Sequence, residues 1–159
     1  MRRKDREISD YDEMLQIADA CDVCRIALQD DGAPYIVPLN FGWEDDHGTL
    51  ILYFHGADTG RKLYLIELNE GLAGFETDCE HRLSEGDTAC DFSYYYSSII
   101  GEGRIEILEE YDEKVHGLRQ ILRHYVKDKD VEAFPMKEEI VAQTCVLRMR
   151  VTKWSAKSH

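Results

Sequence analysis

Short apolar segments separated by dense turn signals fill the first half of the chain. Residues 30–34 and 44–48 are rich in Asp, Gly, Pro and other residues that favour turns. The segments beside them, 23–28, 35–44 and 49–54, are rich in the β-branched and aromatic residues that favour strands. We therefore predict three strands joined by short turns in an antiparallel meander.

The rest of the chain predicts three further strands and four helices. Asp10, with Glu13 three residues later, is typical of a residue that caps the start of a helix. Six strands with few helices favour a closed or split β-barrel over a sandwich or a doubly wound sheet. We expect a mainly β fold, an antiparallel split barrel with flanking helices, as a single domain over residues 1–159. The further strands are expected at 72–79, 93–108 and 144–154, and the helices at 11–21, 61–69, 111–126 and 134–143.

The charge of the chain excludes several classes of partner. The formal net charge is −13, and residues 7–147 carry 31 acidic but only 11 basic groups. A surface this acidic repels nucleic acid and anionic membranes. No apolar run approaches the ~18 residues of a membrane-spanning helix, and the basic start of the chain is not a secretory signal. We expect a cytoplasmic protein that binds neither nucleic acid nor membrane, with its five cysteines reduced.

The strongest local feature is the segment 53–62, where an apolar strand ends in a glycine-containing loop and a helix begins with Arg61 and Lys62. Free N–H groups and the helix dipole attract phosphate to the start of a helix. Arg61 adds a forked donor and Lys62 a point charge. In so acidic a chain, this placement predicts an anion site. The alternative is a solvated basic pair that balances nearby acidic groups, because exposed Arg and Lys are common.

Two further segments have the composition of ligand-binding strands. Residues 34–41 contain Pro38, which cannot donate a hydrogen bond to a neighbouring strand. This predicts either backbone groups free to contact a flat heterocycle or an ordinary bulged strand. In residues 94–104, the hydroxyls of Ser97 and Ser98 are candidates to face a ligand. The alternative there is a strand of aromatic cross-strand pairs.

Histidine and cysteine supply the remaining candidate groups. His55 borders the predicted anion site, where it either donates a proton to a substrate or only hydrogen-bonds to backbone or phosphate. Cys21 and Cys24 run from a helix end into a strand, not from a strand into a helix start, so we expect buried thiols rather than a redox pair. No metal site is predicted, because the other cysteines lack the paired spacing of zinc ligands. His116 and His124 are expected on the surface of their helix.

In combination, these segments resemble the FMN-binding split-barrel family related to pyridoxamine 5′-phosphate oxidase, and within it the nitroimidazole-resistance (Nim-type) proteins. The similar segments follow the order and spacing of that family over most of the chain. The ending 155–159 is Nim-like and lacks the arginine-histidine pattern of the oxidase, so vitamin B6 oxidation is not expected. The matching segments are 1–8, 23–28, 34–41, 52–57, 60–62, 100–104 and 154–157.

The resemblance implies a cofactor and the residues that hold it. It implies FMN, with the flavin phosphate on Arg61 and Lys62, and a homodimer with the flavin at the subunit interface. It also implies that His55 and Gly56 lie beside the flavin. Further contacts are implied from the second strand, from the strand of the two serines, and from a tryptophan that approaches a ring held by the partner subunit. These residues are Tyr35, Val37, Pro38, Leu39, Asn40, Ser97, Ser98 and Trp154.

We therefore expect an FMN-dependent oxidoreductase with His55 as a catalytic residue. Electrons would pass from NAD(P)H through the flavin to a small oxidised acceptor, such as a nitroaromatic. One alternative is a flavin-binding sensor or carrier without turnover, and another is a split-barrel relative that holds haem or a deazaflavin. A zinc-bound interaction module is the most distant alternative. The visible absorption spectrum separates these classes.

Overall fold

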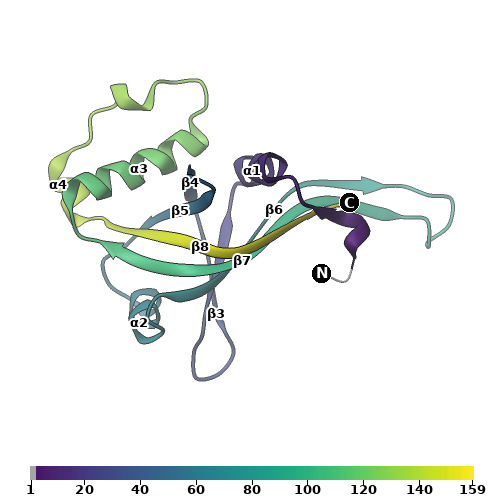
Figure 1. Ribbon diagram of the computed structural model, residues 1–159, viewed down its shortest axis with the longest axis horizontal. Coiled ribbons are helices and arrows are strands. Elements are labelled where there is room, and N and C mark those ends of the chain that lie inside the picture. Colours follow the sequence, from purple (N-terminus) through teal and green to yellow (C-terminus); the bar gives the residue numbers. More distant parts are fainter. Residues whose placement is uncertain (1–2) are drawn as a thin grey trace.

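The computed structural model describes residues 3–159, whose strands form one antiparallel sheet with helices packed around it (Figure 1). The expected antiparallel architecture with flanking helices is therefore confirmed. The strands are β1 (Glu7–Ile8), β2 (Cys24–Leu28), β3 (Tyr35–Leu39), β4 (Phe41–Asp46), β5 (Thr49–Gly56), β6 (Leu72–Ser84), β7 (Ser93–Leu108) and β8 (Cys145–Ser158). The helices are α1 (Tyr11–Ala20), α2 (Arg61–Leu68), α3 (Tyr111–Tyr125) and α4 (Glu138–Gln143), with short 3-10 turns at Lys4–Arg6 and Val131–Ala133.

The chain itself closes the sheet into a barrel. The strand order is β3-β2-β6-β7-β8-β5-β4, yet only Asn40 separates β3 from β4 in the sequence. One residue spans no more than ~3.6 Å, so the two ends of the strand order must meet at Asn40. The predicted three-stranded meander is wrong, because the segment 35–44 is two strands that pair with β2 and β5 respectively. β3 is an end strand of this order, a position that tolerates a proline such as Pro38 because one of its edges has no strand partner.

The barrel core consists of alternate side chains from each strand. Asp10 caps the helix that covers one side of this core, since its carboxylate accepts from the Glu13 N–H at 2.9 Å, as predicted. No helix within residues 3–159 is both long enough and apolar enough to cross a membrane. Fully buried core side chains include Ile26, Leu28, Phe41, Leu52, Phe54, Leu147 and Met149.

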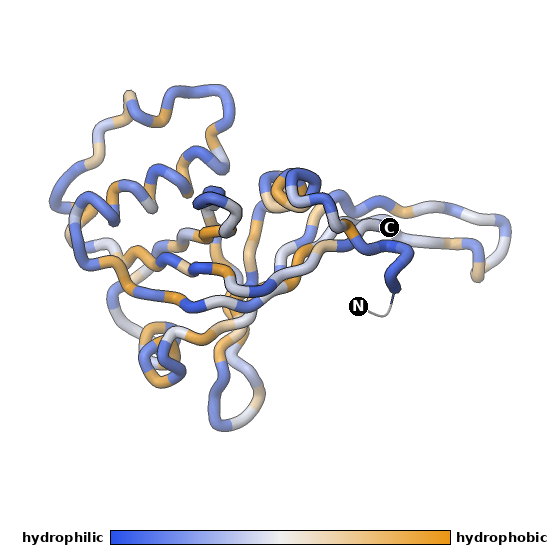
Figure 2. Tube along the Cα trace, in the orientation of Figure 1, coloured by the Kyte–Doolittle hydropathy of each residue, from blue (hydrophilic) through white to orange (hydrophobic). Residues whose placement is uncertain are grey.

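Two glycines allow α3 to lie directly on β4 and β5. A Cβ atom at Gly42 would stand 2.3 Å from the backbone of Gln120, and one at Gly117 would stand 2.8 Å from the Tyr53 ring. Orange and blue positions alternate along α3 in Figure 2, as expected for a helix with one apolar side. This close approach buries His124, so its predicted surface position is wrong, whereas His116 is exposed as predicted.

The β6–β7 arm (residues 80–96) projects from the barrel beside the C-terminal end of β8 (Figure 1). The sequence predicts a polar connection from residue 80 onwards, but β6 continues after an irregularity in register between Cys79 and Arg82. The prediction fails because both faces of this strand are exposed, so no apolar alternation marks it. Contacts between side chains support it instead, such as the Arg82 guanidinium 4.7 Å from the centre of the Tyr95 ring.

Candidate functional site

The β5–α2 turn (residues 55–62) places a lysine against a strand end. Gly60 has φ of 125°, a conformation that favours glycine, and α2 begins at the next residue. No side chain caps this helix, and in the described chain no group pairs with the N–H groups of Arg61 and Lys62. A Cβ atom at Gly56 would stand only 2.7 Å from Lys62 Nζ. Glycine at position 56 therefore makes room for the lysine head group.

Lys62 is a half-buried cation with no counterion among residues 3–159. Burial lowers the pKa of its ammonium group, and the opposing electrostatic contribution comes from the Cys145 thiol on β8. Within residues 3–159 no carboxylate forms an ion pair with Lys62. A partly desolvated cation of this kind is normally paired, so the position fits a bound anion.

Arg61 is more exposed and already has protein partners. Its Nε donates to Asp30 Oδ2 at 2.9 Å, and its Nη2 contacts the same oxygen. The guanidinium carbon lies 4.8 Å from the centre of the Tyr35 ring. The pKa of Asp30 is lowered by the Asp31 backbone N–H and by Arg61. Of the predicted phosphate and flavin contacts, Tyr35, Gly56, Arg61 and Lys62 are thus brought to one end of the barrel.

The other predicted contacts on β3 lie along its edge. Tyr35, Val37 and Leu39 pack against the core, whereas Pro38 and the adjoining Asn40 are exposed. No described strand pairs with the second edge of β3, so its backbone N–H and C=O groups are available to a ligand. Asn40 Nδ2 donates to the hydroxyl of Tyr125 on α3 at 3.3 Å. The β3 edge therefore offers the kind of backbone surface that a flat heterocycle needs.

His55 lies on the opposite face of β5 from the side of Gly56. Consecutive residues of a strand point to opposite faces, and His55 shares its face with Tyr53 and Ile51, which pack under α3. The imidazole borders an apolar cleft that α3 and α4 line, together with the segment joining them. His55 is thus the first residue of the β5–α2 turn, but its side chain faces away from the Lys62 ammonium group.

Ser97, Ser98 and Trp154 lie at the far end of the sheet. Cys145 pairs with Gly56, whereas Trp154 stands nine residues further along β8, roughly 30 Å away in an extended strand. Ser97 donates to Glu80 at 2.7 Å, and Ser98 points to the opposite face of β7. These three residues are therefore not brought to the β5–α2 turn.

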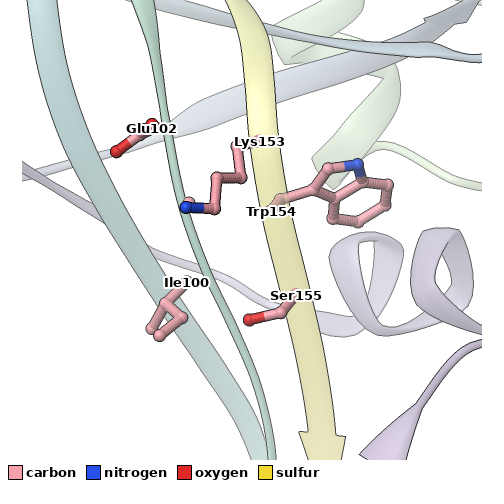
Figure 3. Close-up of a pocket in the computed structure, with 6 residues that line it drawn as sticks. Ile100, Glu102, Lys153, Trp154 and Ser155 are labelled. Carbon is pink, nitrogen blue, oxygen red and sulfur yellow. The ribbon is translucent and has the colours of Figure 1, made fainter. Parts of the chain in front are cut away.

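Trp154 also differs in direction from its neighbours. Figure 3 shows Ile100, Glu102, Lys153 and Ser155 on one side of the β7–β8 pair, while the indole points towards the helices. The four side chains border a hollow of about 260 Å³. The indole makes an edge contact with the Tyr11 ring, with ring centres 5.7 Å apart.

Four of the five cysteines are buried, and burial raises the pKa of their thiols. Cys21 and Cys24 are fully buried, as predicted, and burial raises the pKa of both thiols. Burial also raises the pKa of the neighbouring Cys79 to about 12. The part of the chain that the structure describes contains no group of three or more His, Cys, Asp or Glu side chains placed to hold a metal ion.

Sequence analysis missed three residues of this region. Asp30 holds Arg61, Tyr125 fastens the bend at Asn40, and Cys145 lies beside Lys62. Asp30 had a usable signal, since it is one of two adjacent acids in the turn that precedes Tyr35. Tyr125 and Cys145 had none, because only the packing of α3 and the pairing of β8 bring them near.

Comparison with known proteins gives a family match over nearly the whole chain. The family model described as pyridoxamine 5′-phosphate oxidase matches residues 10–158. No curated protein matches the chain. A solved structure of a candidate 5-nitroimidazole antibiotic resistance protein from Bacteroides thetaiotaomicron VPI-5482 is similar at 29% identity with a TM-score of 0.80. The similarity covers 96% of this chain and 86% of that one.

Two more distant structures share the fold. The flavocytochrome Anf3 from Azotobacter vinelandii is 20% identical with a TM-score of 0.81, over 100% of this chain and 72% of that one. A FAD- and haem-binding protein from Mycobacterium smegmatis is 21% identical with a TM-score of 0.79, over 96% and 72% of the respective chains. At these identities, the two proteins support the fold assignment alone.

Proposed function

The chain belongs to the pyridoxamine 5′-phosphate oxidase family, and we propose that it is an FMN-dependent oxidoreductase. In this proposal, electrons pass from NAD(P)H through the flavin to a small oxidised acceptor. Similarity to a candidate 5-nitroimidazole resistance protein favours a nitroaromatic acceptor. The observation that carries the proposal is the half-buried Lys62 ammonium group, which has no described counterion and stands beside uncapped N–H groups of α2.

The residues of the β5–α2 turn fit the phosphate of FMN. In this proposal Lys62 gains a counterion, and the uncapped N–H groups at the start of α2 supply further donors. Arg61 uses its Nε and Nη2 on Asp30, so N–H donors of its guanidinium group remain for phosphate oxygens. The free edge of β3, from Tyr35 to Asn40, supplies backbone groups for the ring. When bound, the flavin supplies the exchange of electrons between donor and acceptor.

His55 is the proposed source of a proton. A neutral imidazole has one N–H donor and one acceptor nitrogen, and no hydrogen bond engages either in residues 3–159. It can therefore hold a proton at a ring nitrogen and deliver it to an acceptor that reaches this face of β5. Tyr125 and the apolar side chains of α3 line the same face.

We also propose a homodimer with the flavin at the subunit interface. Ser97, Ser98 and Trp154 lie too far along β7 and β8 to contact a ligand at the β5–α2 turn of their own protomer. In a dimer, these residues would contact a flavin that is held at the β5–α2 turn of the second copy. Large exposed apolar side chains, including Ile100 on β7, support an interface on this part of the sheet.

The absorption spectrum of the purified protein tests this function. We expect the two-band spectrum of oxidised flavin, loss of that absorption when NADH or NADPH is added without oxygen, and its return on addition of a nitroaromatic. A bound flavin that neither nucleotide reduces would instead favour a sensor or carrier. The spectrum of haem would show that the protein is a different kind of split-barrel relative.

A further inference from the structure

Asp30 places a negative charge directly beside the cations of the β5–α2 turn. It lies in the turn that joins β2 to β3 (residues 29–34), and its Oδ2 accepts from Arg61 Nε at 2.9 Å and contacts Arg61 Nη2. A carboxylate in contact with one of two cations reduces the positive charge that an anionic ligand meets there. Asp30 therefore affects which phosphorylated ligands the turn can bind.

The carboxylate of Asp30 is held in this position through both of its oxygens. Oδ1 accepts from the Asp31 backbone N–H at 2.8 Å, while Oδ2 faces Arg61. The Asp30 side chain is only 17% exposed, compared with 60% for Arg61. The Asp31 N–H and Arg61 also lower the pKa of Asp30, so the group is anionic at neutral pH. The negative charge is thus a fixed part of the site.

Asp30 also occupies one of the hydrogen-bonding edges of the Arg61 guanidinium group. An arginine has five N–H donors, and Asp30 faces the edge formed by Nε and Nη2. The Tyr35 ring lies against one face of the group, with its centre 4.8 Å from the guanidinium carbon. Among the residues that the structure describes, the remaining donors on Nη1 and Nη2 have no partner. These donors can bind two oxygens of one phosphate group.

The charges at this position suffice for one phosphate group. Arg61 and Lys62 contribute two positive charges and Asp30 one negative charge, which leaves a net charge of +1. One phosphate group that contacts Lys62 and the remaining donors of Arg61 uses this excess. A second phosphate group would have to share a cation that Asp30 already neutralises.

Nearby charged groups make a second phosphate group unfavourable. Asp31 follows in the same turn as Asp30, and Asp58 lies in the β5–α2 turn itself, both with exposed side chains. A further cation, Lys114 of α3, is close enough to affect the Cys145 thiol, but its Nζ donates to the Ala142 carbonyl at 3.2 Å. The acidic side chains therefore disfavour the approach of a second phosphate group.

We propose that Asp30 restricts the β5–α2 turn to a single phosphate group and thereby selects FMN over FAD. FMN ends in a phosphate monoester that carries ~1.5–2 negative charges at pH 7. FAD divides its negative charge between two linked phosphate groups and needs donors for both. This inference rests on the proposed function, and it identifies the residue that determines which flavin the site accepts.

Isothermal titration calorimetry tests this inference on the purified full chain, freed of bound flavin, with riboflavin, FMN and FAD as ligands. The three ligands share the flavin ring and have no, one and two phosphate groups respectively. We expect the wild type to bind FMN at least tenfold more tightly than FAD or riboflavin.

Two matched variants separate the effect of Asp30 from a general effect of charge. Asp30→Asn keeps the size of the side chain but removes its charge and weakens its pairing with Arg61, so the Nε–Nη2 edge becomes available to a second phosphate group. We expect this variant to lower the preference for FMN over FAD at least fivefold, with riboflavin binding unchanged. Asp128→Asn makes the same change at an exposed position after α3 and should leave all three affinities unchanged.

The outcomes distinguish failure of this inference from failure of the proposed function. Equal affinity of the wild type for FMN and riboflavin, or no binding of either, would contradict the phosphate site itself. A clear preference for FMN over riboflavin, with equal binding of FMN and FAD, would retain that site but overturn the role of Asp30.

The variant provides two further ways to overturn the inference. An unchanged ratio of FMN to FAD affinity in Asp30→Asn, shown to be folded by circular dichroism, would remove Asp30 as the selecting residue. Equal weakening of all three ligands would show that Asp30 supports only the local structure, because riboflavin has no phosphate group to sense its charge.

Discussion

Lys62 and Arg61 are adjacent cations that differ in burial and in pairing, so we expect them to contribute unequally to FMN binding. Lys62 is half-buried and has no described counterion, whereas Arg61 is exposed and pairs with Asp30. We expect Lys62→Gln to weaken FMN binding about 10- to 100-fold, the value of a hydrogen bond to a charged group. Arg61→Gln should weaken it less, because exposed ion pairs contribute little.

Quenching of FMN fluorescence measures both affinities, and Lys129→Gln provides the control. Lys129 lies in the exposed segment after α3, far from the β5–α2 turn in the sequence. A larger loss in Arg61→Gln than in Lys62→Gln would mean that the buried lysine is not the main phosphate contact.

His124 gives the protein a pH dependence that the sequence did not suggest. Its side chain is 6% exposed, its Nε2 donates to the Cys21 carbonyl at 2.7 Å, and burial lowers its pKa. The unfolded chain therefore takes up a proton near pH ~6.5, before the folded chain does. The free energy of unfolding should fall as the pH decreases through that value, by no more than about 1.4 kcal/mol per pH unit.

Urea unfolding between about pH 7.5 and pH 5 measures this effect, above the range in which ordinary carboxylates titrate. His124→Gln keeps a side-chain N–H donor but removes the titration, so its stability should depend less on pH in this interval. Parallel curves for the wild type and the variant would assign the pH dependence to other groups.

Sequence reasoning at the residue scale was strongest where neighbours in the chain act together. Arg61 and Lys62 are adjacent, and Gly56 and Gly60 shape the same short turn, so a local pattern indicated an anion site. Asp30 and Tyr125 were missed because their partners lie 31 and 85 residues away. His124 was misplaced because the approach of α3 to β4 depends on Gly42, a residue of another element.

At the scale of elements, the close packing of α3 on β4 can be tested. A Cβ atom at Gly42 would stand 2.3 Å from the Gln120 and Ile121 backbone, which cannot move without shifting the helix. We expect Gly42→Ala to lower the free energy of unfolding by about 1–3 kcal/mol or more. Gly32→Ala is the matched control, because nothing lies within 4 Å of that position.

Urea denaturation followed by circular dichroism compares the two variants. Gly32→Ala should change the free energy of unfolding by less than about 0.5 kcal/mol. Equal stability of Gly42→Ala and the wild type would show that α3 does not pack on β4 at the distance described.

Most elements could be predicted because their composition and alternation mark them, and β7 was predicted with its observed bounds. The failures have physical causes. The segment 35–44 has continuous β propensity, but barrel closure divides it at Asn40 between two ends of the strand order. The outer part of β6 has no apolar face, because its support comes from pairing with β7. Local composition contains neither kind of information.

At the scale of the whole molecule, the proposed dimer depends on the outer face of β7 and β8. Ile100 is 55% exposed there. Ile140 on α4 is 59% exposed on another part of the surface, so a substitution at Ile140 is a matched control for the same substitution at Ile100. We expect Ile100→Arg to yield monomers with reduced FMN content, since the site then lacks its second copy. Ile140→Arg should remain a dimer with normal FMN content.

Sedimentation equilibrium and the absorption of the same samples measure association and flavin content together. A monomeric wild type that retains FMN would contradict the proposed interface site. A dimer that persists in Ile100→Arg but dissociates in Ile140→Arg would place the interface on the α3–α4 side instead.

The central claim is that the β5–α2 turn holds the phosphate of a flavin. The most direct measurement compares the affinities of FMN and riboflavin, which differ only in that phosphate, for the wild type and for the double variant Arg61→Ala, Lys62→Ala. We predict that the wild type strongly prefers FMN and that the double variant binds both equally weakly, at the riboflavin level. A folded double variant that keeps the full preference for FMN would contradict the claim.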